Sequence, residues 1–177
     1  MIHLKINTKI LFSLLLSISL LVNCKAIAPS IVSNDISYNS ETIEDFTQDL
    51  FAIIFKEQES LFKKYVVTPD IVRLLAPEST NEKTDAQIES EMILNQTNKF
   101  LNDCKLVRLD LKENGYNPDK TNFLGYKTFP EDSQGEIHIL SIEIEIKGKR
   151  GSVPITYYVK EGKFFAFELL NSSNVVK

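Results

Sequence analysis

Strict alternation of apolar and polar residues in one segment constrains the fold of this chain more than any other feature. In residues 138–147 (HILSIEIEIK), aliphatic side chains take every second position from Leu140 to Ile146, and polar side chains take the positions between them. Successive side chains of a strand point to opposite faces, so the pattern predicts an antiparallel strand with one face buried and the other in water. Such a strand needs a second layer of structure over its apolar face.

Turn-forming residues predict further strands on both sides of this segment. The predicted strands cover residues 107–111, 121–129, 138–147, 152–160 and 163–170. The predicted turns between them are residues 113–120 (ENGYNPDK), 130–135 (PEDSQG), 148–151 (GKRG) and 161–162 (EG). Pro154 lacks the N–H that an interior strand donates, so we expect it near a strand start or at a sheet edge.

Helical periodicity precedes the strands. The predicted helices cover residues 42–65, 68–75 and 84–104, with a polar loop over 76–83. Ser40 or Thr42 can cap the first helix, and Pro69 suits the first turn of the second. Thr84 and Gln87 have the spacing of a capping box at the start of the third helix.

This order of elements predicts an α+β fold. Two to three N-terminal helices should pack on one face of a curled antiparallel sheet of four to five strands. The order is similar to that of the cystatin-like and nuclear-transport-factor-2-like (NTF2-like) cone. The final hairpin resembles that group too, with a short Glu-Gly turn before an aromatic strand in residues 155–169 (ITYYVKEGKFFAFEL). The likeness covers roughly residues 42–170 and implies a concave face that holds ligands.

The N-terminal segment has the pattern of an export signal. Lys5 and Lys9 precede an apolar run over residues 10–22, and no acidic residue occurs before Cys24. As a helix the run would be roughly 20 Å long, which is short for a bilayer core of about 30 Å. It ends in Leu21-Val22-Asn23-Cys24, which resembles the lipobox of bacterial lipoproteins. Asn23 departs from that pattern, in which Gly, Ala or Ser is common.

The lipobox resemblance implies that Cys24 is diacylated and that the signal is cut before it. Two acyl chains suffice for stable attachment to a membrane. Residues 1–23 are then the signal peptide, 24–41 the lipidated cysteine with a flexible tether, and 42–177 a single α+β domain. Lys25, rather than Asp, follows the cysteine, which by the sorting pattern of enteric lipoproteins favours the outer membrane over the inner. The alternative is an uncleaved signal anchor with an incidental cysteine.

Charge and residue counts argue against several classes of function. Two of the 20 basic residues and none of the 24 acidic ones lie in residues 1–23, so the remainder has a net charge of −6. Nucleic-acid binding requires a basic surface, and the largest basic cluster is 147–150 (KGKR). Past Cys24 the chain has one thiol, Cys104, and one imidazole, His138. We therefore expect no disulfide, no metal and no cofactor.

Four residues form the candidate ligand or partner surface. His138 is in phase with Leu140 and could act as a general base, although no Asp or Glu shares its face nearby. Together with Tyr157, Tyr158 and Phe164 it could line an apolar pocket or form a protein-binding face. The alternative is that these aromatic residues fill the core. Cys104 lies on the apolar stripe of its helix, where we expect a buried residue rather than a nucleophile.

The sequence thus predicts a lipid-anchored protein of the bacterial cell envelope. Its small α+β domain would bind an envelope protein or an apolar small ligand, without catalysis. One alternative is an NTF2-like enzyme that acts on a hydrophobic small molecule through His138. A second alternative is a structural or assembly role in the envelope with no ligand.

Overall fold

The structure is a computed structural model that describes residues 42–129, 137–170 and 175–176. These residues all belong to one compact unit, residues 36–177. The predicted signal peptide, lipobox and tether fall within residues 1–41 and therefore lie outside the described residues, as does the predicted turn over 130–135. Within the described ranges, no helix combines the length and apolar character that crossing a membrane requires.

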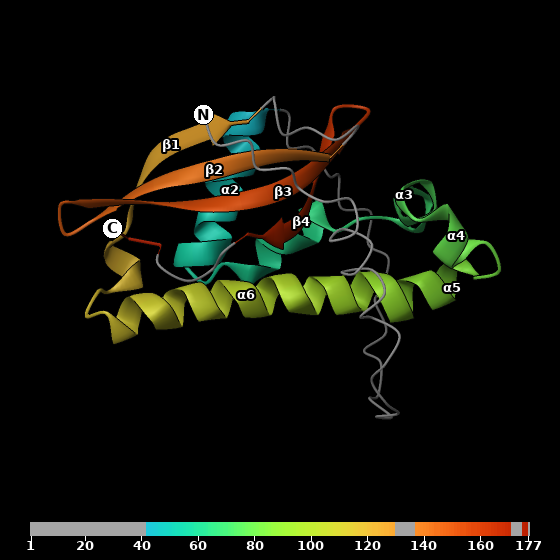
Figure 1. The fold of residues 1–177 in the computed structure, drawn as a ribbon, viewed down its shortest axis with the longest axis horizontal. Helices are drawn as coiled ribbons and strands as arrows, with labels where there is room; N and C mark the ends of the chain where they lie inside the picture. The colour runs from blue at the N-terminus through green and yellow to red at the C-terminus, as the bar shows by residue number, and fades with distance from the viewer. Residues whose placement is uncertain (1–41, 130–136, 171–174, 177) are drawn as a thin grey trace, which may run out of the picture. The chain divides into compact units, whose positions relative to one another are not determined.

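The fold is α+β, as predicted, with the helices first and a four-stranded antiparallel sheet after them (Figure 1). The helical elements are α2 (Ile43–Phe55), the 3-10 helix η2 (Glu59–Tyr65), α3 (Pro69–Leu75), α4 (Pro77–Thr80), α5 (Asp85–Ile88), the π-helix η3 (Glu89–Ile93), α6 (Leu94–Glu113) and the 3-10 helix η4 (Pro118–Lys120). The strands are β1 (Asn122–Thr128), β2 (Ile137–Ile146), β3 (Lys149–Lys160) and β4 (Lys163–Leu169). They lie side by side in chain order.

The first helix begins as predicted but ends ten residues early. Thr42 caps it, because its hydroxyl accepts a hydrogen bond from the Asp45 backbone N–H at 3.1 Å. Helix α2 ends at Phe55 instead of continuing to Tyr65, and Glu57 follows with a φ of 57°. The 3-10 helix η2 then keeps Phe62 and Tyr65 buried. The prediction of one helix over 42–65 is wrong, because two helices at an angle can bury the same apolar residues.

The strand predicted over residues 107–111 is also wrong, since these residues form the last turns of α6. Val107 and Leu111 are buried, but Leu109 is 49% exposed. The buried apolar residues on this part of the helix repeat at spacings of four, three and four: Phe100, Cys104, Val107 and Leu111. The short alternation at 107–111 fits a strand as well, but the longer helical repeat decides the structure.

The region before α6 contains more helix than predicted. The predicted loop over 76–83 includes the single turn of α4. The capping box at Thr84 is confirmed: its hydroxyl accepts from the Gln87 backbone N–H, and its own N–H donates to Gln87 Oε1 at 2.9 Å. A π turn follows, and it accommodates one extra residue. Ile88 and Ile93, five residues apart, can therefore both be buried.

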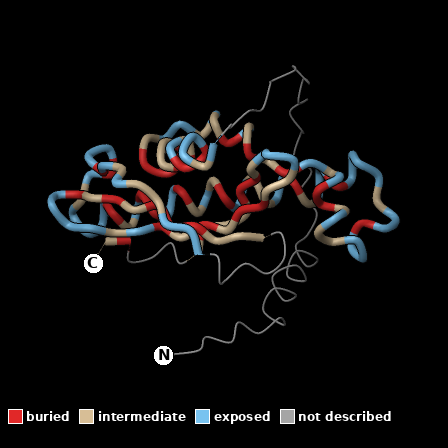
Figure 2. Tube along the Cα trace, turned by 90° about the horizontal axis from the view of Figure 1, so that it is seen from above, coloured by how far each residue is buried: buried red, intermediate tan, exposed pale blue. Residues whose placement is uncertain are grey.

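The main core lies between the sheet and helices α2 and α6. As the alternation predicts, the buried aliphatic residues of β2 and β3 point to one face: Leu140, Ile142 and Ile144 of β2 with Val153 and Ile155 of β3. Phe46 and Leu50 of α2 and Phe100 and Val107 of α6 belong to the same cluster. Figure 2 shows these buried segments in the middle of the described chain, with exposed residues around them.

A second, smaller core lies on the other side of the β3–β4 hairpin. Tyr158 pairs with Phe165 across the hairpin, and both side chains point away from the main core. Helices α3, α5 and η3 cover them with Ile71, Ile88 and Ile93. These helices lie together near the N-terminal end of α6 (Figure 1). The helices therefore contact both sides of the sheet at this end, rather than one face only.

Pro154 lies in the middle of β3, an interior strand, and not near its start. Its carbonyl accepts a hydrogen bond from the Leu170 N–H at 2.8 Å. In an antiparallel sheet, the backbone N and O atoms of one residue point to the same neighbouring strand. The backbone N of Pro154 therefore points toward Leu170, one residue past the end of β4. No hydrogen bond to β2 is lost, and the position is a local edge of the sheet.

A buried arginine links α6 to the end of α2. Arg108 is 5% exposed, and its Nη1 donates to the carbonyls of Ile53 and Ile54 at 3.1 and 3.0 Å. Its Nη2 donates to Glu59 Oε1 at 3.1 Å. The last carbonyls of a helix have no partner within the helix, so the guanidinium satisfies groups that would otherwise be buried without a donor.

Replacing Arg108 with Ala should lower the free energy of unfolding by about 2–4 kcal/mol, because two helix-end carbonyls and Glu59 lose their donor. Urea unfolding of the full chain, followed by circular dichroism, measures this loss. Lys105→Ala is the matched control: Lys105 also lies near Glu59, but it is exposed, so its removal should cost no more than about 0.5 kcal/mol. Equal losses in the two variants would contradict the capping role.

Candidate functional site

Three of the four predicted site residues lie together at one end of the sheet. His138 of β2 stands opposite Tyr157 of β3, and their ring centroids are 5.4 Å apart. The ring of Phe164 lies 6.0 Å from that of Tyr157 and stacks at 5.0 Å on Phe46 from α2. The meander thus brings His138, Tyr157 and Phe164 together on the face that α2 covers.

Most of this aromatic cluster is interior. Tyr157 is 6% exposed, and its burial raises the pKa of its hydroxyl. His138 and Phe164 are half-buried. Tyr158 does not join them: it points to the opposite side of the hairpin, is 1% exposed, and belongs to the second core. In this structure the two tyrosines are core residues, and only His138 and Phe164 also reach solvent.

A tyrosine–carboxylate pair that the sequence analysis did not single out joins α2 to β1. The Tyr126 hydroxyl donates to Glu44 Oε1 at 2.7 Å. This hydrogen bond lowers the pKa of the Glu44 carboxyl and raises the pKa of Tyr126. The two residues are 82 positions apart in the chain, so no local pattern could have indicated their contact.

The remaining titratable candidates are the Cys104 thiol and the carboxylates of Glu143 and Glu145. Cys104 is fully buried, and its burial raises the pKa of the thiol to about 12. Glu143 and Glu145 share the sheet face away from the main core, and Glu143 accepts from Lys127 Nζ at 3.1 Å. Among the residues that the structure describes, no group of three or more His, Cys, Asp or Glu side chains is placed to hold a metal ion.

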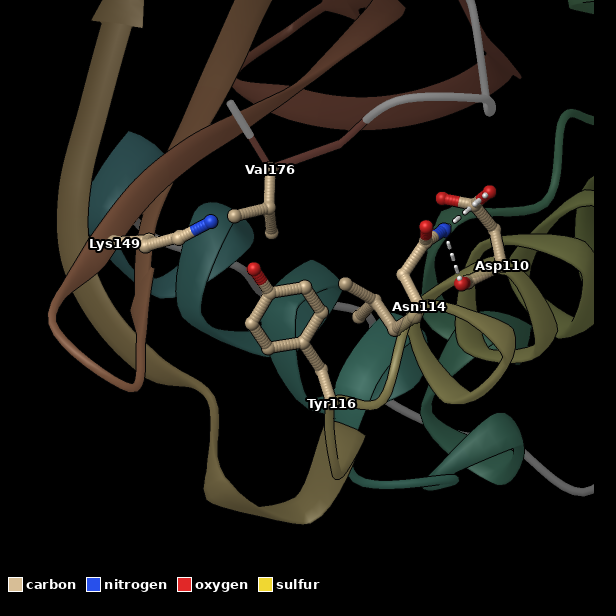
Figure 3. A pocket seen from close by; sticks show the side chains of 6 residues that line it. Asp110, Asn114, Tyr116, Lys149 and Val176 are labelled. Carbon is tan, nitrogen blue, oxygen red and sulfur yellow. Dashed lines mark hydrogen bonds between the residues drawn. The ribbon is translucent and has the colours of Figure 1, made fainter.

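The structure also contains a polar pocket that the sequence analysis did not predict, at the C-terminal end of α6 (Figure 3). Its volume is about 330 Å³. The lining residues come from the end of α6, the turn after it, the start of β3 and the C-terminal segment: Asp110, Leu111, Asn114, Tyr116, Lys149 and Val176. Because these segments are distant in the chain, no single motif marks the pocket.

Two backbone features form its walls. The turn after α6 places Tyr116 against the helix end, where its N–H donates to the Leu111 carbonyl at 2.9 Å. On the opposite side, the Ser152 N–H donates to the Val175 carbonyl at 3.0 Å and holds Val176 next to β3. A Cβ at Gly151 would lie 2.1 Å from the Val175 carbonyl oxygen, so the close approach of this segment depends on glycine.

Lys149 and Asp110, which carry opposite charges, line this pocket, and Lys147 lies nearby on the β2–β3 turn. The ammonium groups of Lys147 and Lys149 lie 5.6 and 5.9 Å from the centre of the Tyr116 ring. Lys147 also donates to the Gly115 carbonyl at 2.7 Å. Asp110 accepts a hydrogen bond from Asn114 Nδ2 at 3.2 Å. Figure 3 shows Lys149 and Val176 on one side, Asp110 on the other, and Tyr116 between them.

The pocket and the aromatic cluster lie at opposite ends of β2. Lys149 pairs with Ile146 at the end of that strand, whereas His138 lies near its start. Eight residues of strand separate the two positions by about 26 Å at 3.3 Å per residue. His138 and the charged groups of the pocket therefore cannot act on one small molecule.

Comparisons with protein-family models, with curated proteins and with solved structures found no match. The α+β class therefore stands on the described elements alone. The likeness to the cystatin-like and NTF2-like cone stays a prediction, as does the likeness of residues 21–24 to a lipobox.

Cys104 should resist thiol reagents in the folded protein, since both its burial and its raised pKa suppress the reactive thiolate. We expect alkylation by iodoacetamide at pH 8 to be about 100-fold or more slower in buffer than in urea. Mass spectrometry of the Cys104 peptide measures both rates without interference from Cys24. A cysteine placed at the exposed position Leu106 of the same helix (Leu106→Cys) should react at an ordinary rate. Rapid alkylation of folded Cys104 would contradict its assignment as a core residue.

Proposed function

We propose that this protein is a lipid-anchored protein of the bacterial cell envelope whose α+β domain binds a partner or a small ligand and carries out no catalysis. The observation that carries the proposal is the cysteine that ends the N-terminal apolar run. Lys5 and Lys9, the length of the run and the position of Cys24 agree with lipidation at that residue. Lys25 favours the outer membrane on the same sorting pattern.

The arrangement of the domain supports binding over the enzyme alternative. Tyr157 packs on His138, and the rings of Phe46 and Phe164 continue the cluster. General-base catalysis at His138 requires room for a substrate next to the imidazole, and these rings occupy its core side. The polar hollow at the other end of β2, lined by Asp110 and Lys149, supports ligand binding over a purely structural role.

Lipidation can be tested by the intact mass of the protein extracted from membranes. The wild-type protein should begin at Cys24 and carry two or three acyl chains, whereas Cys24→Ala should lack them, because no other acyl attachment is predicted. Cys104→Ala is the control and should keep the lipid. A wild-type protein that retains residues 1–23 without lipid would instead be a signal-anchored protein, and the proposal would be withdrawn.

A further inference from the structure

The tip of the β2–β3 hairpin (residues 147–150) concentrates positive charge at one end of the sheet (Figure 1). Lys147, Lys149 and Arg150 are all exposed there, and no acidic residue occurs in 146–151. None of these three residues forms an ion pair within the described part of the chain. Three unpaired positive charges therefore lie together on a chain whose net charge past residue 23 is −6.

The backbone holds this tip in a defined shape. Lys147 and Gly148 have φ angles of 51° and 75°, and the tight type I′ turn of a two-residue hairpin requires positive φ at both positions. Ile146 and Lys149 pair directly beside the turn. Lys147 Nζ donates to the Gly115 carbonyl at 2.7 Å, which attaches the tip to the turn after α6. The hairpin thus presents its charges on a fixed support.

The charge at this end of the domain stays positive when its neighbours are included. Glu145 stands opposite Arg150 in the sheet, and Asp110 and Glu113 lie in the last turn of α6 together with Lys112. These three acidic residues do not cancel the three basic residues of the tip and Lys112, whereas the rest of the chain past residue 23 is negative. An anionic surface therefore attracts this end of the domain and repels the remainder.

We propose that the hairpin tip docks on the anionic headgroups of the membrane to which the protein is anchored, and so fixes the orientation of the domain. The proposal rests on the lipid anchor proposed above and goes beyond it, because acyl chains on Cys24 hold the domain near a membrane without orienting it. A Lys or Arg at an anionic surface strengthens binding about fivefold, so the three residues of the tip together contribute on the order of 100-fold.

The chain between Cys24 and the domain is long enough for this contact. Residues 25–41 can span at most roughly 55–60 Å. Helix α2, which follows them, begins beside the middle of β2, because Glu44 contacts Tyr126 and Tyr126 pairs with Ile142. The whole of β2 is only about 33 Å long. The tip is therefore within reach of a membrane that holds Cys24.

A lipid surface suits the tip better than an acidic protein does. The anchor keeps headgroups permanently close, and the resulting high effective concentration makes even a weak attraction sufficient. A specific protein interface has a well-packed apolar or aromatic centre. The tip offers none, since all four of its residues are exposed and none has a large apolar side chain.

The test compares how closely two ends of the domain approach the lipid. The full acylated chain, with a donor dye on Ser152→Cys or on Ser79→Cys, is held in vesicles by its own anchor, and energy transfer to an acceptor dye on the lipid headgroups is measured. Both positions are exposed; Ser152 lies next to the tip, and Ser79 lies in α4, toward the other end of α6. Helix α6 is about 30 Å long, so the two dyes are well separated.

In vesicles that contain phosphatidylglycerol, energy transfer from position 152 should exceed that from position 79. In vesicles of phosphatidylcholine alone the difference should disappear, because the headgroups carry no net charge. Salt at roughly 1 M should also remove it, since the Debye length falls to about 3 Å. Cys104 is buried and Cys24 is acylated, so only the introduced cysteine takes the dye.

Two triple variants show whether the tip itself makes the contact. The test variant combines three changes in the tip: Lys147→Gln, Lys149→Gln and Arg150→Gln. The control removes the same charge at positions away from the tip: Lys63→Gln, Lys160→Gln and Lys163→Gln. The tip variant should lose the difference in energy transfer, and the control should keep it. Circular dichroism confirms that each variant is folded.

Equal energy transfer from the two positions in phosphatidylglycerol vesicles would overturn the proposal and leave an acidic protein as the partner of the tip. The proposal also fails if the tip variant keeps the difference, or if the control loses it, because net charge alone would then decide the outcome. Failure here is distinguishable from failure of the proposed function, since the acyl chains are measured separately by mass. A signal-anchored protein can be tested in the same way with Cys24→Ala, because residues 1–23 would hold it in the vesicle.

Discussion

The described fold depends on one buried contact, between the guanidinium of Arg108 and the end of α2. Without it, the carbonyls of Ile53 and Ile54 would be enclosed with no donor. The same group reaches Glu59 in η2, so one side chain sets where α2 stops, where the next helix begins, and how both lie against α6. The aromatic residues of η2 can then enter the core, where Phe62 stacks on Phe100 at 4.4 Å.

The two ends of α6 contact different parts of the sheet. Toward its N-terminal end the helix contacts β4, where Gln96 Nε2 donates to the Phe167 carbonyl at 3.0 Å and Lys99 pairs with Glu168. Its C-terminal end, one turn past Arg108, lies next to the β2–β3 hairpin, because Leu111 packs in the main core. A helix held in this way near both ends brings its negative C-terminal end close to two lysines that are distant in sequence. The charged pocket follows from the position of α6.

The sequence predicted those parts of the fold that local patterns determine. Alternation in 138–147, the Glu-Gly turn at 161–162 and the capping box at Thr84 all depend on neighbouring residues, and all three are present. The length of the first helix was wrong for a tertiary reason: Arg108, from a distant helix, caps α2 where the apolar pattern continues. The strand over 107–111 was wrong because a short alternation fits the longer helical repeat of α6 as well. The pocket was missed for a tertiary reason too. The basic residues of 147–150 are visible in the sequence, but their approach to Tyr116 requires the β2–β3 hairpin and the turn after α6 to be placed together.

The two ends of the sheet differ because of which side chains occupy them. At the His138 end, Phe46, Tyr157 and Phe164 fill the space between α2 and the hairpin, so burial there serves stability. At the other end, β3 carries Gly151 in place of a large residue, and the chain near Val175 takes the room that a side chain would occupy. The backbone near Val175 fills less space here than the aromatic rings fill at the His138 end. The half-buried Tyr116 contributes a polar hydroxyl to this region. A polar space therefore remains at this end, lined by Asp110 and Lys149.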